Sequence, residues 1–505
     1  MSANRKADAI SAFPAVTLLI GLFIGIHTTD IYDIYILALA IILIAINMYM
    51  WIKPKFIYQT FHRTLCTLIF ILLGIVSYHN CTSQITIEKG KSEAYGYIER
   101  YIRSDDNRVT VSFKADSLRV NNKLYTDVEG NAYLSNYTEE ITPGTYVRLL
   151  GDVDCNNRDS TLFRFYAKKH IVDTTKIAHI PYIINVIRDW TISTLASCGY
   201  TRENTGLLLA LILGDKSELD YDIRQNFSDC GIVHILAVSG MHVGIIYLFL
   251  CFTIKAPLKR YPVVSSIITI ILLWVYAIIA GLAPSIIRAT LMMSSYEILK
   301  TKTNELRPLS TLYMTLFLIL LFTPQNVTSL GLWLSFTAVW GILTFYNHVA
   351  YIYRFSFPPF RYIYNSLALS FVAQISTMPI LLYTFGTFPN MFLLSNLLTV
   401  PLIAPIILGA ITALILSPIS TIGAEIIAMP VNDLTTFVCH CAKWIASFEY
   451  SLTTDIDFGV TDLIFSMLAL YYLSVWLEEN KHRYIIMSIS AIVLIITSNI
   501  VLPLI

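Results

Sequence analysis

The chain has 505 residues, of which 55% are hydrophobic and only 14% are charged. Soluble domains carry about 25% charged residues, so this composition excludes an ordinary soluble globule. The formal net charge is +1, which excludes a general attraction to polyanions and confines any nucleic-acid site to a local part of the chain.

Three apolar segments begin the chain, at about residues 13–28, 34–52 and 64–79. Segments of roughly this length cross a bilayer as helices. The turn TTDIYD after the first is acidic, whereas the loop KPKFIYQTFHR after the second is basic, and basic loops stay in the cytoplasm. We therefore predict three transmembrane helices in residues 1–81, with a cytoplasmic N-terminus and a first helix that is not cleaved as a signal peptide.

Residues 82–178 form a long polar segment with a different pattern. The stretch NRVTVSFKA alternates apolar and polar residues, and DVEGNAYLSN and GTYVRLLGDVD continue as short strands between turn residues. Alternation with closely spaced turns predicts a small β-barrel. The strand count suits an OB-like barrel, a fold that often binds single strands or sugars. The charges of the surrounding loops place this domain in the periplasm.

Near the end of this segment, the run LFRFYAKKH interleaves aromatic and basic residues. This composition is typical of a platform for nucleic acid, with Arg164, Tyr166, Lys168 and Lys169 as the contacting residues. An ordinary solvated linker is the alternative interpretation of the same run.

The chain contains eight cysteines and no CxxC pair. Cys439 and Cys441 are too close together for the usual zinc spacing, so no metal site and no cofactor is predicted. Cys81 and Cys155 fall in the polar segment, where an oxidising periplasm would allow a disulfide between them. Most of the other cysteines lie in or beside apolar runs, where small core residues are expected.

Residues 179–230 are predicted to form amphipathic helices that lie on the membrane surface or cap a helix bundle, because their apolar runs are too short to cross. In residues 231–505 the longer apolar segments return. They lie at about 232–253, 262–281, 284–300, 308–323, 331–347, 363–384, 461–477 and 484–504. The basic loops KAPLKR, KTKTNELR and YRFSFPPFR are predicted to be cytoplasmic, and TPQNVTS and TTDIDFGVTD to lie outside.

Residues 395–449 need a separate interpretation. Their flanks, 386–394 and 451–461, are both predicted outside, so the part between crosses an even number of times. Pro401 and Pro405 favour a re-entrant or broken helix over two full spans, since broken backbone is tolerated at membrane depth beside a cavity or protein. The predicted fold is a polytopic α-helical membrane protein of about 11–13 transmembrane or re-entrant helices, with one small periplasmic OB-like β-barrel.

The apolar stretch IVHILAVSGMHVGIIYLFL contains His234, Ser239 and His242. Polar groups at bilayer depth are costly and usually face a bundle interior or an aqueous cavity. On an unbroken helix the two histidines would lie on one face, two turns apart and too far to share a metal ion. Arg288 has three interpretations: contact with a phosphate, a pair with Glu297, or a position at the membrane interface.

The chain resembles the ComEC family of competence DNA-uptake channels. The resemblance rests on LLLALILGDKSELDYDIRQNFSDCGIVHILAVSGMHVGIIY, WVYAIIAGLAPSIIRATLMM, LGLWLSFTAVWGIL and AQISTMPILLYTFGTFPNMFLLSNLLTVPLIAP, in this order. It implies a periplasmic OB-like domain, a competence domain at 231–505, and passage of one DNA strand through the inner membrane. Many members carry a metallo-β-lactamase-like domain, and this sequence shows no histidine-rich signature of one. The implied partners are therefore a periplasmic DNA receptor, a separate nuclease and a cytoplasmic motor helicase.

The resemblance also implies a polar path for the DNA strand. Its candidate lining residues are His234, Ser239, Gly240, His242, Arg288, Gln374 and Asn396. Gly240 and Gly244 would let helices or a ligand approach closely. Trp333 and Phe336 would either stack bases or pack the helices.

Two other functions remain open from the residues alone. A membrane enzyme acting on a lipid or cell-wall glycan would use Ser239 or His242, although no G-x-S-x-G elbow is present. A small-solute transporter would be expected to show inverted repeats, and none is clear. The letters GKS in EKGKSE lack the context of a P-loop, so no ATPase and no catalytic residue is predicted.

Overall fold

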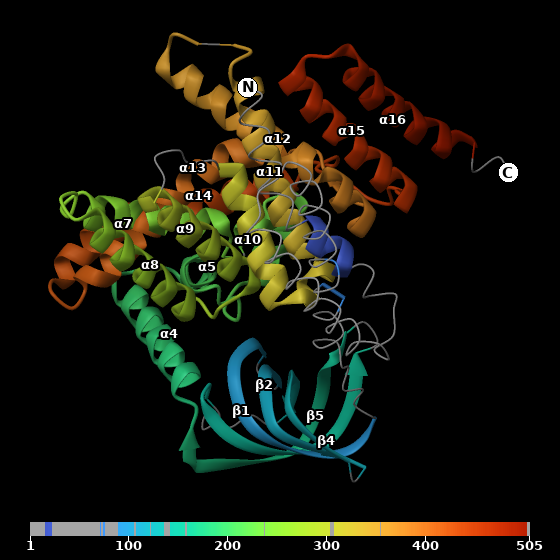
Figure 1. The fold of residues 1–505 in the computed structure, drawn as a ribbon. Coiled ribbons are helices and arrows are strands. Elements are labelled where there is room, and N and C mark those ends of the chain that lie inside the picture. Colours follow the sequence, from blue (N-terminus) through green and yellow to red (C-terminus); the bar gives the residue numbers. More distant parts are fainter. Residues whose placement is uncertain are drawn as a thin grey trace, which may run out of the picture.

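A computed structural model gives the fold. It describes residues 16–22, 71, 74–75, 89–105, 108–121, 123–135, 142–156, 159–236, 238–302, 308–353 and 355–501. The three predicted N-terminal spans lie largely outside the described residues. Cys81 also lies outside them, so its disulfide with Cys155 stays a prediction. Figure 1 shows a β-barrel joined to a helical part by the helix α4.

Five strands form the barrel. They are β1 (Gly90–Asp105), β2 (Arg108–Val120), β3 (Lys123–Ser135), β4 (Thr145–Asn156) and β5 (Asp159–Ile177). Their order is β1-β2-β3-β5-β4, and β1 also pairs with β4, which closes the barrel. The pair β3–β5 is parallel and the other pairs are antiparallel. The closed five-stranded barrel confirms the predicted OB-like domain.

The alternation seen in the sequence fills the interior of the barrel. Val109, Val111 and Phe113 of β2 are at most 2% exposed. Phe163 of β5 meets Phe113 edge to face, with ring centres 6.4 Å apart. Successive residues of a strand point to opposite faces, so the residues between them face outward.

The helical part follows the barrel. Its helices are α4 (His179–Ser197), α5 (Arg202–Leu213), α6 (Tyr221–Asp229), α7 (Gly240–Leu250), α8 (Pro262–Ile279), α9 (Pro284–Lys302), α10 (Pro308–Phe322), α11 (Leu330–Ala350), α12 (Pro358–Phe385), α13 (Phe392–Leu416), α14 (Thr421–Ala446), α15 (Val460–Glu479) and α16 (His482–Val501). Short helical turns lie at η2 (Val233–Ile235), η3 (Cys251–Lys255) and η4 (Pro324–Thr328). Among the described helices, six are long and apolar enough to cross a membrane, namely α8 and α11 to α15. The chain is therefore a multi-pass membrane protein.

Helix α5 is buried, so the interpretation as a membrane-surface helix is wrong for α5. Its residues from Leu207 to Ile212 are at most 5% exposed. Asn204 donates to Asn432 Oδ1 at 2.8 Å and to Thr436 Oγ1 at 2.7 Å, which ties α5 to α14. A helix that is apolar all round is buried by its neighbours, whatever its length.

Residues 395–449 form two continuous helices, α13 and α14, of 25 and 26 residues. The predicted re-entrant or broken helix is wrong, because Pro401 and Pro405 lie inside α13. Neighbouring helices and hydroxyl side chains allow prolines within membrane helices. The short strands β6 (Phe388–Pro389) and β7 (Leu452–Thr453) pair with each other. Both flanks of the hairpin therefore lie at the same end, as an even number of crossings requires.

Candidate functional site

The start of α7 forms the centre of the candidate site. Ser239 is the N-cap residue, and its N–H donates to His242 Nδ1 at 3.1 Å. The predicted span from residue 232 is therefore wrong in its first part, because α7 begins only at Gly240. The apolar composition hid this break, which Gly240 and the cap formed by Ser239 and His242 produce. His234 lies in η2 and is exposed, whereas His242 is fully buried.

One ring nitrogen of His242 has a hydrogen-bond partner and the other has none among the described residues. Because Nδ1 accepts the N–H of Ser239, the proton of the neutral ring lies on Nε2. His242 Nε2 is buried and has no hydrogen-bond partner among the described residues. An unsatisfied buried donor costs about 1–3 kcal/mol, so this nitrogen calls for a partner outside the described residues, such as water, a ligand or another part of the chain.

The start of α9 lies beside the start of α7. Ser285 Oγ donates to the backbone oxygen of Val238 at 2.7 Å. A Cβ added to Gly240 would lie 3.7 Å from the Cβ of Ala289. This contact brings the segment before α7 next to Arg288, which is 5% exposed.

Arg288 also faces the start of α11. A Cβ added to Gly331 would lie 3.4 Å from Arg288 Nη2 and 3.8 Å from Ser329 Oγ. Arg288 Nε is buried without a partner, and no described carboxylate forms an ion pair with this guanidinium. Of the three interpretations of Arg288, the pairing with Glu297 is therefore wrong. That carboxylate instead accepts from Lys255 Nζ at 2.5 Å and from Tyr247.

Three helix N-termini thus converge around one guanidinium. Helices α7, α9 and α11 each present the positive end of a helix dipole at this point. Backbone N–H groups at helix N-termini bind anions. The chemistry of this arrangement suits an anion. Sequence analysis missed Ser285, Ser329 and Gly331, although Pro284 and Ser329 are ordinary markers of a helix start.

The other candidate residues lie apart from this cluster. Asn396 is on the second turn of α13, and Gln374 is in the middle of α12. Asn396 Oδ1 and Gln374 Nε2 are buried without partners, like His242 Nε2. Within the described part of the chain, no hydrogen bond joins them to the start of α7. The structure therefore groups Ser239, Gly240 and His242 at the start of α7, with Arg288 of α9 beside Gly240. His234 lies in η2, within electrostatic reach of His242, whereas Gln374 and Asn396 lie on other helices.

The two aromatic candidates pack the helices. Phe336 is 5% exposed and belongs to the apolar cluster with α10. Trp333 packs against this cluster, and its indole N–H donates to the backbone oxygen of Val327 at 2.7 Å. At Gly244 an added Cβ would meet no described atom within 4 Å, so helix packing does not require this glycine.

The basic and aromatic run of the barrel is part of β5 and is not a linker. Arg164, Tyr166 and Lys168 are exposed, while Phe163 and Phe165 on either side of Arg164 point inward. Tyr166 stacks on Tyr133 of β3, with ring centres 5.0 Å apart and planes 12° apart. Lys168 Nζ lies 2.5 Å from Asp152, which reduces its availability to a ligand. Lys169 is also exposed.

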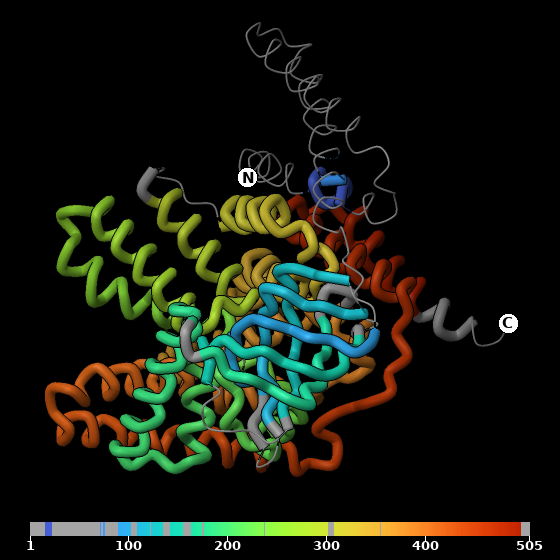
Figure 2. Tube along the Cα trace, turned by 90° about the horizontal axis from the view of Figure 1, so that it is seen from below, coloured from blue at the N-terminus to red at the C-terminus, as the bar shows by residue number. Residues whose placement is uncertain are grey.

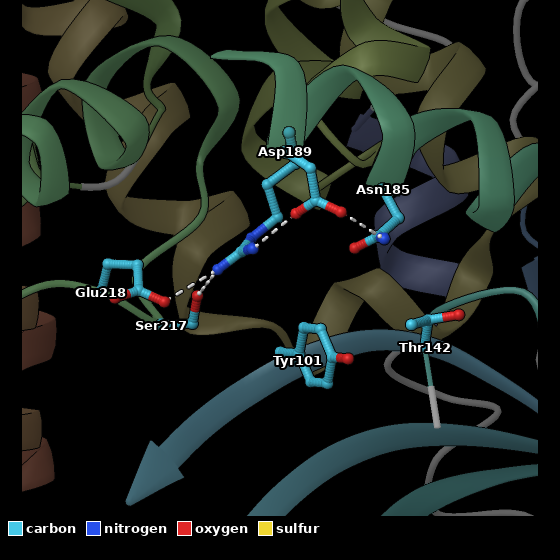
Figure 3. A pocket seen from close by; sticks show the side chains of 7 residues that line it. Tyr101, Thr142, Asn185, Asp189, Ser217 and Glu218 are labelled. Atoms are coloured by element: carbon cyan, nitrogen blue, oxygen red, sulfur yellow. Dashed lines mark hydrogen bonds and ion pairs between the residues drawn. The ribbon is translucent and has the colours of Figure 1, made fainter. Parts of the chain in front are cut away.

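A charged junction joins the barrel to the helical part (Figure 3). Arg188 Nε of α4 donates to Asp215 at 2.5 Å, and Nη2 donates to Glu218 at 3.1 Å. Figure 3 shows Asp189 and Glu218 above Tyr101, which rises from β1. The guanidinium carbon lies 5.7 Å from the centre of the Tyr101 ring. Burial lowers the pKa of Arg188, but Asp215 and the other carboxylates outweigh it and leave this pKa above its ordinary value.

The junction sets the barrel at one end of the helices. The loop that holds Asp215 begins at Gly214, where an added Cβ would lie 3.3 Å from Val238. Val238 directly precedes the cap of α7. The barrel therefore sits at the end where α7, α9 and α11 begin, and Figure 2 shows it in front of the helices when they are seen from that end.

An OB-like barrel seated on helices of spanning length defines a multi-pass membrane protein with a folded domain at one end. Residues 211–480 match the family described as Competence protein. This match covers more than half of the chain, so the protein belongs to the competence protein family, and the ComEC resemblance is confirmed.

Three relatives show how far the similarity extends. ComE operon protein 3 of Bacillus subtilis is 30% identical over 224 residues, which are 43% of this chain and 27% of that protein. Recombination protein 2 of Haemophilus influenzae is 23% identical over 222 residues, 41% of this chain and 28% of that protein. Competence protein ComA of Neisseria gonorrhoeae is 27% identical over 155 residues, 29% of this chain and 22% of that protein. The chain thus matches less than a third of each relative's length, and no solved structure matches it.

Proposed function

We propose that this protein takes part in DNA uptake for transformation and conducts single-stranded DNA through the inner membrane into the cytoplasm. Family membership supports the role in uptake. The observation that carries the channel proposal is Arg288, a nearly buried cation without a described carboxylate partner. It lies where the N-termini of three helices meet.

The chemistry of this position suits a phosphate backbone. A charge at bilayer depth is costly and normally pairs with another group or faces water. A phosphate passing Arg288 would receive its charge-assisted hydrogen bonds and the orphan N–H of His242. Discontinuous membrane helices present their N-termini to anionic substrates in the same way. Gln374 and Asn396 would supply further polar groups deeper in the helices.

The barrel supplies the first contact for the DNA strand. The stacked pair of Tyr166 and Tyr133 is a surface on which bases can stack, and Arg164 beside it adds positive charge. The basic loops that follow α7 and α9 stay in the cytoplasm by the positive-inside rule. Since the barrel lies at the opposite end, it faces the periplasm. A periplasmic DNA receptor, a separate nuclease and a cytoplasmic motor helicase complete the proposed pathway.

One observation favours the enzymatic alternative, because Ser239 Oγ lies 3.0 Å from His242 Nδ1. In a hydrolase this nitrogen would take the proton of the serine. Here the same nitrogen already accepts the N–H of Ser239, and no described carboxylate orients the ring. The pair therefore acts as a helix cap, and the channel is the better-supported function.

The test replaces Arg288 in a host whose transformation depends on this protein. We expect Arg288→Ala to reduce the entry of labelled DNA into the cytoplasm at least tenfold, because about 1.5–3 kcal/mol of charged hydrogen bonding is lost. Arg288→Lys should restore part of the entry. The matched control is Arg202→Ala, whose side chain is 93% exposed. Normal DNA entry in the Arg288→Ala variant, at a normal membrane level of protein, would overturn the proposal.

A further inference from the structure

We propose that the protein binds the head group of an anionic phospholipid in a basic pocket at the end of α7 that faces away from the barrel. The pocket has a volume of about 340 Å³. It lies between η3, the first turn of α8 and the last turn of α9. Three lysines line it: Lys255, Lys259 and Lys300.

A buried carboxylate fixes the position of one of these lysines. Glu297 is 0% exposed and accepts from Lys255 Nζ at 2.5 Å and from Ser266 Oγ at 2.8 Å. Tyr247 donates to the same carboxylate. Lys255 is thereby held at the wall of the pocket with its charge largely balanced, so it shapes the site and adds little net charge.

The other two lysines provide the attraction. Lys259 and Lys300 are exposed and form no ion pair with any described carboxylate. Lys300 Nζ lies 5.7 Å from the centre of the Tyr296 ring, which steadies it beside the pocket. Ser265 and Ser266 add hydroxyl groups to the lining. Two free ammonium groups and hydroxyls together match the oxygens of a phosphate diester.

The surroundings favour a lipid over a soluble anion. On α8, a helix of spanning length, Val263, Ile267 and Ile271 are 58%, 52% and 55% exposed. Ile298 on α9 is 46% exposed. Such side chains on a membrane helix face acyl chains, so a head group in the pocket would have its chains along this apolar surface. Basic pockets between helices on the cytoplasmic side bind anionic lipid head groups.

This site is separate from the proposed DNA path. Ser239 and Arg288 lie at the barrel end, whereas Lys255 and Glu297 lie at the other end of α7 and α9. Lipid binding can be measured without DNA. Failure of the lipid proposal therefore leaves the channel proposal intact, and the reverse also holds.

The experiment measures binding to the purified full chain in detergent by native mass spectrometry. Phosphatidylglycerol, phosphatidylcholine with the same acyl chains, and inorganic phosphate serve as separate probes. We expect phosphatidylglycerol to be retained at low concentration and phosphatidylcholine to be lost. The double variant Lys259→Gln with Lys300→Gln should bind phosphatidylglycerol about 30-fold more weakly, since each lysine near a membrane contributes about 1 kcal/mol.

The matched control is Lys481→Gln, whose side chain is 57% exposed between α15 and α16. It should retain wild-type binding of phosphatidylglycerol. Thermal unfolding without added lipid shows whether the variants are folded, which is expected because both replaced side chains are exposed. Equal retention of the two lipids would overturn the proposal. The same holds for wild-type binding by the double variant, an equal loss in the control, or saturation by inorganic phosphate at the lipid's concentration.

Discussion

Replacement of Arg188 by alanine should loosen the barrel from the helical part. The Arg188 side chain is 14% exposed and that of Asp215 is 17% exposed, so both charges are largely removed from water. Loss of the guanidinium leaves Asp215 without its 2.5 Å partner and Glu218 without its 3.1 Å partner. Breaking a buried ion pair costs about 3–5 kcal/mol. The partial exposure of this pair reduces the expected cost to about 2–3 kcal/mol.

Limited proteolysis of the full chain is the suitable assay. Cleavage of a transiently opened segment follows its equilibrium population, so a cost of about 2 kcal/mol should speed cleavage between residues 178 and 220 roughly 30-fold. The barrel itself should remain resistant, because its hydrogen bonds close on themselves. The Arg202→Ala control should change little. Arg202 is 93% exposed, and its contact with Glu218 is long, at 4.0 Å.

A double variant tests whether the uncompensated charge is the cause of the destabilisation. Arg188→Gln combined with Asp215→Asn removes both charges of the pair, so it should cost less than the sum of the two single changes. Cleavage of Arg188→Ala at the rate of Arg202→Ala would refute the assignment of this cluster as the junction. Strictly additive effects of the two single changes would refute the argument that an uncompensated charge is the cause.

Two further changes follow from the site. Gly331→Val should reduce DNA entry several-fold at a normal protein level, because a Cβ there lies 3.4 Å from Arg288 Nη2 and a branched side chain displaces the guanidinium. Gly244→Ala is the control, and equal DNA entry in both variants would contradict this geometry. Tyr166→Ala should weaken binding of a fluorescent single-stranded oligonucleotide by about 1–3 kcal/mol, as measured by anisotropy with the full chain in detergent. Unchanged anisotropy titrations would remove the stacking surface from the proposal.

The sequence predicted the local structures better than the contacts between them. Alternation at Val109, Val111 and Phe113 reported the inward face of a barrel strand, which depends only on neighbouring residues. Hydropathy could not locate the start of α7, since Val233 and Ile235 are as apolar as a helix interior although they form a separate turn. The cap formed by Ser239 and His242 was the available signal.

The sequence alone could not predict which helix is buried or which helix N-termini meet, because both depend on packing between helices. The run from Leu207 to Ile212 is too short to span, and only the packing of α4, α13 and α14 around it decides that it is buried. The meeting of Gly240, Arg288 and Gly331 joins three helix starts that are far apart along the chain. Such a meeting is set by helix packing, which periodicity in one helix does not contain.

The two-residue strands β6 and β7 have a consequence for the insertion of the chain into the membrane. The turn at 417–420 between α13 and α14 contains no lysine or arginine, so charge gives this hairpin no preferred direction during biogenesis. Phe388 and Pro389 can pair with Thr453 and Leu452 only after both helices have crossed completely. The small sheet can therefore form only in a hairpin whose two helices have both crossed the membrane.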